Sequence, residues 1–227
     1  MKKLVQTAAA GVLAWLIASG CASEPKREPP FDPATPLTQA EEYAYGRSIA
    51  ARLTLGHELS SDVKAREYLA RVGGVVAAAS ARPDPYDGWR FYIVRDTHVS
   101  TWSAPGGFVF ITVGALKAAR NEDALAALLA QEMAHSALRH ALDGEPVLDI
   151  RPTKESWPFT PEWGKESFRA TCDRAAERAK AGWTEAQEQA ASAWANAALV
   201  GAGYATEEAA VAEARVKRFT EELGAVR

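Results

Sequence analysis

Cysteine is scarce in this sequence of 227 residues, which contains two, and this number excludes a disulfide-stapled scaffold. A chain of this length buries enough surface to fold without disulfide or metal crosslinks. An excess of positive charge is also missing, since 26 Lys and Arg face 29 Asp and Glu and the net charge is −3. Nucleic-acid-binding domains carry a basic surface, so we expect no nucleic-acid partner. What the chain has in abundance is alanine, which favours helices over strands.

The N-terminus reads as a secretory signal. Lys2 and Lys3 precede an apolar run from Leu4 to Ala18, and small residues follow. No other part of the sequence has an apolar run of the length that spans a membrane. We therefore predict a signal peptide over residues 1–20, a proline-rich tether over 21–36 and a folded domain over 37–227.

The segment Ala18-Ser19-Gly20-Cys21 resembles the lipobox of bacterial lipoproteins, in which the cysteine carries the lipid. This resemblance implies that Cys21 anchors the chain on the periplasmic side of the bacterial envelope. No aspartate follows Cys21, which in the enteric sorting pattern favours the outer membrane. A plain signal peptide with an incidental cysteine is the alternative. If Cys21 is lipidated, Cys172 has no partner for a disulfide within the chain.

The spacing of apolar residues predicts an α+β domain that is mostly helical. Expected helices cover 38–55, 61–83, 121–142, 165–181, 184–200 and 206–223, and the intervening 143–164 is predicted to be a loop. Strands are expected at 90–95 and 108–113, with a turn at 104–107 between them. The architecture is therefore a set of helices around a small sheet.

The helix expected to begin at Asn121 carries the candidate chemistry. At about 100° per residue, Glu132 lies in the middle of the apolar stripe formed by Leu125 and Leu128. Gln131 and His135 lie along one edge of the same stripe. A carboxylate that points into a core needs a partner or a cleft. This pattern alone fits either a functional site or a structural hydrogen bond between Glu132 and a histidine.

Several ordered motifs together resemble family forty-eight of the metallopeptidases, which includes CAAX prenyl endopeptidases, HtpX-like peptidases and periplasmic quality-control peptidases of the outer membrane. Gln131-Glu132-Met133-Ala134-His135 is similar to the family's H-E-x-x-H helix, with glutamine in place of the first histidine. The other matching segments are Arg71-Val72-Gly73, the run from Ser103 to Phe110, the helix start Asn121-Glu122-Asp123 and Arg139-His140. The resemblance covers about residues 38–219 and implies a gluzincin-type domain, with the small sheet beside the zinc-type helix.

The resemblance also implies roles for individual residues. His135 occupies a zinc-ligand position, Gln131 replaces the other histidine, and Glu132 occupies the general-base position. Trp102 and the segment formed by Ala104, Pro105, Gly106 and Gly107 correspond to the side of the substrate cleft. The third zinc ligand of the family is a glutamate on a later helix, and counting back from Ala202-Gly203-Tyr204 places Ala190 there.

Two of the three expected ligands are therefore replaced, because an amide is a poor zinc ligand and alanine is none. Glu188 precedes Ala190 by two residues and is expected on another face of its helix. On the expected helix 121–142, His140 also faces away from His135, and His57 is expected at a helix end. His98, which precedes the predicted turn 104–107, is the remaining histidine near the site without an assigned role.

Two functions follow from this reading. The first is a degenerate peptidase-like domain without a cofactor, whose Glu132 is vestigial and which serves as a binding or scaffold module for an envelope protein. The second is an active zinc metalloendopeptidase of envelope protein quality control, whose metal site is rebuilt with Gln131, His98 or Glu188. A structural lipoprotein with a chance similarity is the remaining reading.

Overall fold

The computed structural model describes residues 37–147 and 162–207, with the side chains of the second range described from Lys165 on. The predicted signal peptide, the tether, most of the predicted loop and nearly all of the predicted helix 206–223 lie outside the described residues. The predicted α+β class, mostly helical with a small sheet, is confirmed.

The long helices begin at side chains that cap them. Thr38 and Glu41 form a capping box at the start of α1 (Gln39–Leu53), and Thr184 and Gln187 form another before α6 (Glu185–Ala202). In two other helices, one N-cap side chain accepts a hydrogen bond from the first turn: Asp62 before α2 (Val63–Ala79) and Asn121 before α4 (Glu122–Ala137). The short α3 (Val113–Ala118) and the long α5 (Glu162–Ala181) complete the set of α-helices in the described ranges.

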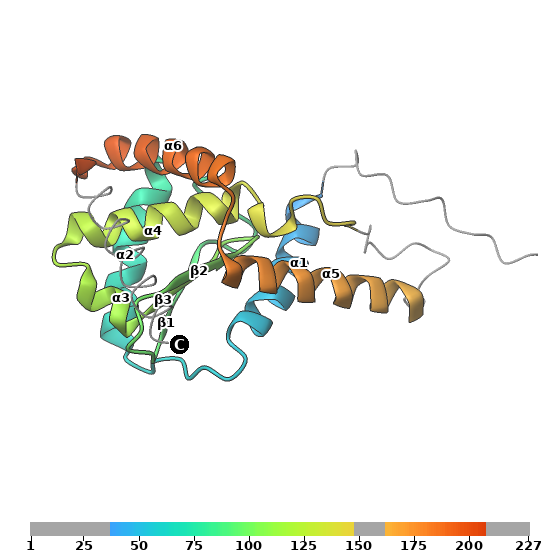
Figure 1. Cartoon of the computed structure of the whole chain (residues 1–227). Coiled ribbons are helices and arrows are strands. Elements are labelled where there is room, and N and C mark those ends of the chain that lie inside the picture. Colours follow the sequence, from blue (N-terminus) through green and yellow to red (C-terminus); the bar gives the residue numbers. More distant parts are fainter. Residues whose placement is uncertain (1–36, 148–161, 208–227) are drawn as a thin grey trace, which may run out of the picture. The chain divides into compact units, whose positions relative to one another are not determined.

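The sheet has three strands in the order β1-β3-β2 (Figure 1). β1 (Arg90–Val94) and β3 (Phe108–Thr112) are the two strands that the sequence predicts, and they pair in parallel with Phe91 opposite Val109. β2 (Thr101–Ala104) pairs with β3 in the antiparallel sense and was not predicted, and neither was α3. Four residues just before a turn are too few for a clear alternating pattern.

Both faces of the sheet are covered by helices, which is why all five residues of β3 are buried. Val109 and Ile111 point into a core shared with α2, α4 and α6. Phe108 and Phe110 point into a second core with α1 and α5. In Figure 1, α4 lies between the sheet and α6, whereas α1 and α5 lie on the other side.

The turn between β2 and β3 is packed closely against α1. A Cβ atom at Gly46 would lie 1.7 Å from the carbonyl oxygen of Pro105, so glycine is required in α1 at this point. Gly106 has φ of 78°, a conformation that favours glycine, and lies against the backbone of Tyr43. The predicted turn 104–107 is thus a buried junction between the sheet and α1.

The helix that begins at Glu122 ends at Ala137 rather than at Leu142 as expected. Leu138 caps it, and Arg139 follows with φ of 60°, in the left-handed region. The guanidinium of Arg139 binds the buried carboxylate of Glu42, with 2.7 Å between Nε and Oε2, and this contact holds the reversal. The chain then makes one 3-10 turn over His140–Leu142. Sequence periodicity missed this end because it depends on Glu42, which is distant in sequence.

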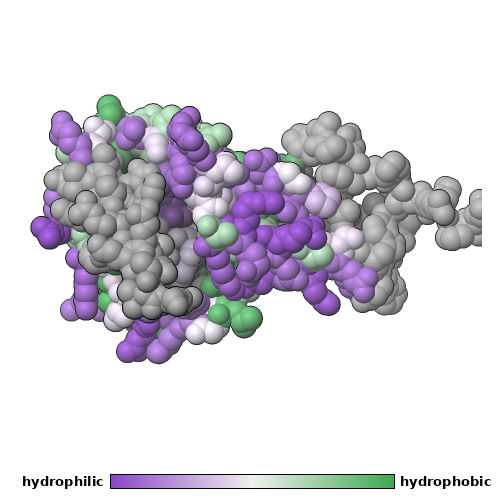
Figure 2. Space-filling view, viewed as in Figure 1, coloured by the Kyte–Doolittle hydropathy of each residue, from purple (hydrophilic) through white to green (hydrophobic). Residues whose placement is uncertain are grey.

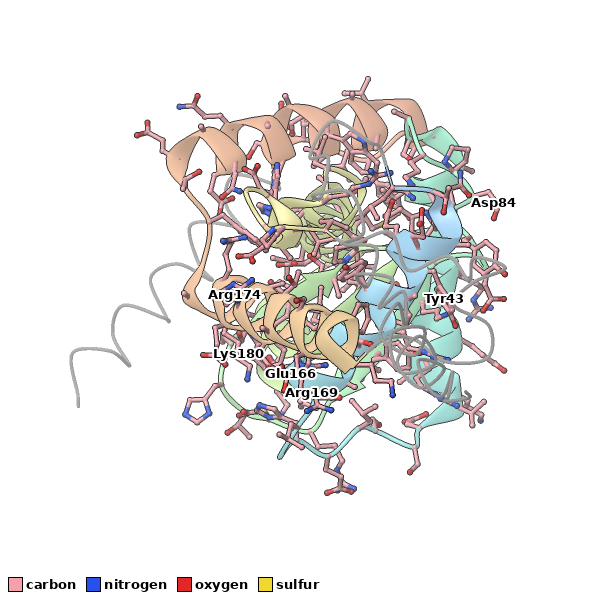
Figure 3. All side chains as sticks on the ribbon, turned by 90° about the vertical axis from the view of Figure 1, so that its right-hand side faces the viewer. Tyr43, Asp84, Glu166, Arg169, Arg174 and Lys180 are labelled. Carbon is pink, nitrogen blue, oxygen red and sulfur yellow. The ribbon has the colours of Figure 1, made fainter. Side chains whose placement is uncertain are left out.

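The outer side of α5 is strongly hydrophilic (Figure 2). Its exposed charged residues include Glu166, Arg169, Arg174 and Lys180, which are labelled in Figure 3. Arg174 and Arg178 reach back to the carboxylate of Glu145, at 2.8 Å each. Within residues 37–147 and 162–207, no helix is both long and apolar enough to cross a membrane.

Candidate functional site

Glu132 is buried between α4 and the sheet, as the position of its side chain in the apolar stripe predicts. It is 6% exposed, like Leu125 and Leu128 beside it. Its Oε1 accepts a hydrogen bond of 2.7 Å from the hydroxyl of Thr101 on β2. Its Oε2 is buried without a hydrogen-bond partner among the described residues. Burying an oxygen without a hydrogen-bond partner costs free energy. Glu132 therefore keeps one carboxylate oxygen that can accept a hydrogen bond and has no donor among the described residues.

Gln131 and His135 lie one turn apart on α4 and both face Glu188 on α6. The amide nitrogen of Gln131 donates to Glu188 Oε2 at 2.9 Å, and Nε2 of His135 lies 3.4 Å from the same oxygen. Ser192, one turn further along α6, lies 3.5 Å from the amide oxygen of Gln131. Four side chains from two helices thus form one polar cluster, in which Gln131 and Glu188 are 57 positions apart in sequence.

His140 completes this cluster from the other side. Because α4 ends at Ala137, the 3-10 turn brings His140 back onto His135, and their Nδ1 atoms lie 2.8 Å apart. Trp183, in the connection from α5 to α6, stacks on the imidazole of His135, with 4.6 Å between the two ring centroids. The expectation that His140 faces away from His135 is wrong, since it assumed a helix that continues to Leu142.

The hydrogen bonds restrict where the protons of this cluster can lie. A contact between two Nδ1 atoms requires that one of them donates and the other accepts. Burial and the neighbouring His135 lower the pKa of His140, so its neutral form is favoured. With His140 as the donor, Nδ1 of His135 accepts and its Nε2 donates to Glu188. Both nitrogens of His135 are then engaged within the protein.

Glu188 is the negative charge of the cluster. Its side chain is 38% exposed, and the hydrogen bond from His135 holds its pKa below the usual value against the opposing effect of burial. An ionised Glu188 is the acceptor that both Gln131 and His135 need.

The position of Glu188 corrects the count that placed Ala190 at the third-ligand position. Ala190 is exposed on α6, whereas Glu188, two residues earlier, faces α4. The count from Ala202–Tyr204 failed because the face of α6 that meets α4 depends on how the two helices pack. Among the side chains that meet here, His135 and Glu188 are of types that ligate zinc, and Gln131 is not.

The segment from Ala104 to Gly107 is fixed at both ends of its turn. Ser136 of α4 donates to the carbonyl of Ala104 at 2.7 Å and accepts from the backbone N–H of Gly107 at 3.1 Å. Gly106 donates to Glu42 at 2.8 Å. These contacts hold β2 at a fixed position against α4, with Thr101 beside Glu132.

The remaining predicted residues lie apart from this cluster. Trp102 alternates with Thr101 on β2, so it packs into the core with α1 and α5 and contacts His57, on the sheet face opposite Glu132. His98 is exposed and pairs with Asp96 at 2.7 Å. Sequence reasoning missed Thr101 and Trp183; for Thr101, the four residues of β2 were too few to show the alternation that places its side chain on the face of Glu132.

Comparison with known proteins bears on the same elements. The model of peptidase family M48 matches residues 64–156, which include α2, the sheet and α4. The part of the chain that carries the candidate site is therefore related to peptidase family M48. Mitochondrial metalloendopeptidase OMA1 of Schizosaccharomyces pombe is 37% identical over 76 residues, which are 34% of this chain and 22% of OMA1. The "Putative beta-barrel assembly-enhancing protease" of Vibrio cholerae is 30% identical over 105 residues, which are 46% of this chain and 21% of that protease. The match thus spans about a fifth of each relative's length.

The donor set of this M48-related domain fits a zinc site poorly. Zinc in proteins takes imidazole, thiolate and carboxylate ligands, and a catalytic site has three of them. Here His135 and Glu188 supply two ligands of these types. Gln131 points its amide N–H, which cannot bind a metal ion, at the same carboxylate oxygen of Glu188. In the described ranges, no group of three or more His, Cys, Asp or Glu side chains is arranged to hold a metal ion.

Proposed function

We propose that this M48-related domain has lost its catalytic zinc and works as a binding module for polypeptides of the bacterial envelope. The main support for this proposal is the polar cluster formed by Gln131, Glu188, His135 and His140. Each of these polar groups uses the others as hydrogen-bond partners, so the cluster is stable without an ion. A zinc ion would have to break the Gln131–Glu188 contact and would gain only a weak amide ligand in return.

The edge of the sheet is the part of the domain that suits a polypeptide. Among residues 37–147 and 162–207, β2 pairs only with β3 in the sheet order β1-β3-β2, so its other side is an edge of the described sheet. An extended segment can add to such an edge through main-chain hydrogen bonds. Glu132 Oε2 and the hydroxyl of Ser103, both buried without partners among the described residues, lie on the two elements that border this edge. They supply an acceptor and a donor for polar groups of the bound segment.

The proposed function includes a lipid anchor at Cys21. Lipid on Cys21 would hold the domain at the periplasmic face of the outer membrane, and the residues up to Pro36 would act as its tether. The domain would then meet its clients beside the membrane. Cys21→Ser tests the anchor independently of the site.

Metal content and cleavage are the decisive measurements for the site. Purified wild-type protein should contain substoichiometric zinc after dialysis and should not cleave an unstructured peptide substrate. Gln131→His should raise zinc affinity by at least about 10–100-fold, because it supplies the ligand that His135 and Glu188 lack. Gln189→His, on the exposed side of α6, is the matched control and should leave zinc affinity unchanged.

An active zinc metalloendopeptidase is the second candidate, and the position of Glu188 favours it. Glu132, His135 and Glu188 are all in place on α4 and α6, so a single residue separates this site from a complete one. Stoichiometric zinc in the wild-type protein, with cleavage that Glu132→Gln abolishes, would establish the enzyme and refute the binding module.

A further inference from the structure

A groove lies at the opposite end of α4 from the polar cluster. It consists of two cavities, of about 370 and 350 Å³, that share Tyr68 and Glu122 in their linings. Val72 and Val75 of α2 line the first, and apolar residues of α2, α3 and α4 line the second: Ala65, Leu69, Leu116 and Leu125. Tyr68 and Val75 are 40% and 47% exposed, which is high for side chains of this size beside a core. We call this surface the α2 groove.

The chain itself leads into the α2 groove. After α6, Gly203 turns the backbone with φ of 80°, and Tyr204 lines the first cavity. The hydroxyl of Tyr204 lies 3.1 Å from Glu122 Oε1, and the N–H of Ala205 donates to Asp123 at 3.3 Å. The chain is helical again at residue 207. The residues that follow therefore start beside the groove.

The sequence of residues 208–227 suits an apolar groove. Its apolar residues recur at intervals of three and four: Ala209, Ala212, Val216, Phe219 and Leu223. At about 100° per residue these five positions fall on one narrow stripe of a helix. Arg218 and Glu221 fall on the opposite side. Twenty helical residues extend about 30 Å, which is enough to follow the whole of α2.

We propose that residues 208–227 continue as an amphipathic helix and dock their apolar stripe in the α2 groove. The contacts of Tyr204 and Ala205 with the start of α4 anchor the segment at one end, so docking closes only a short loop. The docked helix covers Tyr68 and Val75 and ties α6, which carries Glu188, to α2. A second copy of the chain or a separate protein could fill the same groove, and the experiment separates these cases.

The test uses the full chain with Cys21→Ser, so that it can be purified without lipid. Phe219→Asp with Leu223→Asp disrupts the stripe, and Arg218→Gln with Glu221→Gln is the control on the opposite side. We expect the stripe variant to lower the Tm by about 6 °C or more, from the lost burial of two large side chains. Radical labelling of Tyr68 and Val75 should rise in that variant, and the control variant should match the parent protein in both measurements.

Disulfide trapping gives a second readout that does not depend on the stripe variant folding well. Val75→Cys is combined in turn with cysteine at Ala212, Val216, Phe219 or Leu223, and with Arg218→Cys as the control. Docking predicts an intrachain disulfide for at least one stripe position and none for Arg218. Disulfides that form only between chains would assign the groove to a second copy and overturn the proposal. Equal Tm and labelling in all variants, with no disulfide at any stripe position, would also overturn it.

Discussion

Removal of the Glu42 carboxylate should destabilise the domain more than removal of any exposed acidic residue. Glu42 is fully buried in α1, and its two oxygens bind Arg82 at 2.8 Å, Arg139 at 2.7 Å and the N–H of Gly106 at 2.8 Å. The carboxylate thus joins α1, the segment after α2, the end of α4 and the β2–β3 turn. Glu42→Ala leaves two cations and a backbone donor without their acceptor.

The magnitude follows from the burial of the contacts. Truncating one partner of a buried, hydrogen-bonded ion pair costs about 3–5 kcal/mol. For a domain of this size each kcal/mol lowers the Tm by about 2–4 °C, so Glu42→Ala should lower it by about 6–20 °C. Urea unfolding followed by far-ultraviolet circular dichroism measures the same loss as a lower midpoint.

Glu58→Ala is the control because Glu58 forms an equally short ion pair at the surface. Its contact with Arg95 is 2.8 Å, but the two side chains are 70% and 57% exposed. Such a pair contributes about 0–1 kcal/mol. Equal effects of Glu42→Ala and Glu58→Ala would refute the view that the buried carboxylate organises the junction of α1, α4 and the turn.

Three further predictions concern single groups. Burial and the hydrogen bond to Glu122 raise the pKa of Tyr204 to about 12; its contribution to stability is therefore complete below pH 10 and is lost as the pH rises towards 12. Tyrosinate absorbance should show a group that titrates near pH 12 and that Tyr204→Phe removes, and a titration identical in both proteins would contradict this. Burial raises the pKa of Cys172 to about 11, so its thiol should resist iodoacetamide at pH 8 in the native protein and react in urea; equal rates would place it at the surface. Cys21→Ser should release the protein from membranes or block its processing, and a wild-type protein without acyl chains in the soluble fraction would exclude the lipid anchor.

The sequence alone was sufficient for the features that local interactions control. The capping residues Thr38, Asn121 and Thr184 start their helices where predicted, because a cap bonds to the backbone three residues away. The burial of Glu132 follows from its place in the apolar stripe of one helix. The similarity to peptidase family M48 follows from the order of several short motifs, each of which is readable without the fold.

The tertiary structure decided which polar groups meet. Glu188 and not Ala190 faces Gln131, because the packing of α6 on α4 selects the face of each helix, and sequence spacing within α6 does not encode it. His140 returns to His135 because Glu42, almost a hundred residues earlier, holds Arg139 in a left-handed conformation that ends α4. The local sequence around His140 favours a continuing helix. Contacts between distant segments thus set the chemistry of this site, and local periodicity set only the elements that carry it.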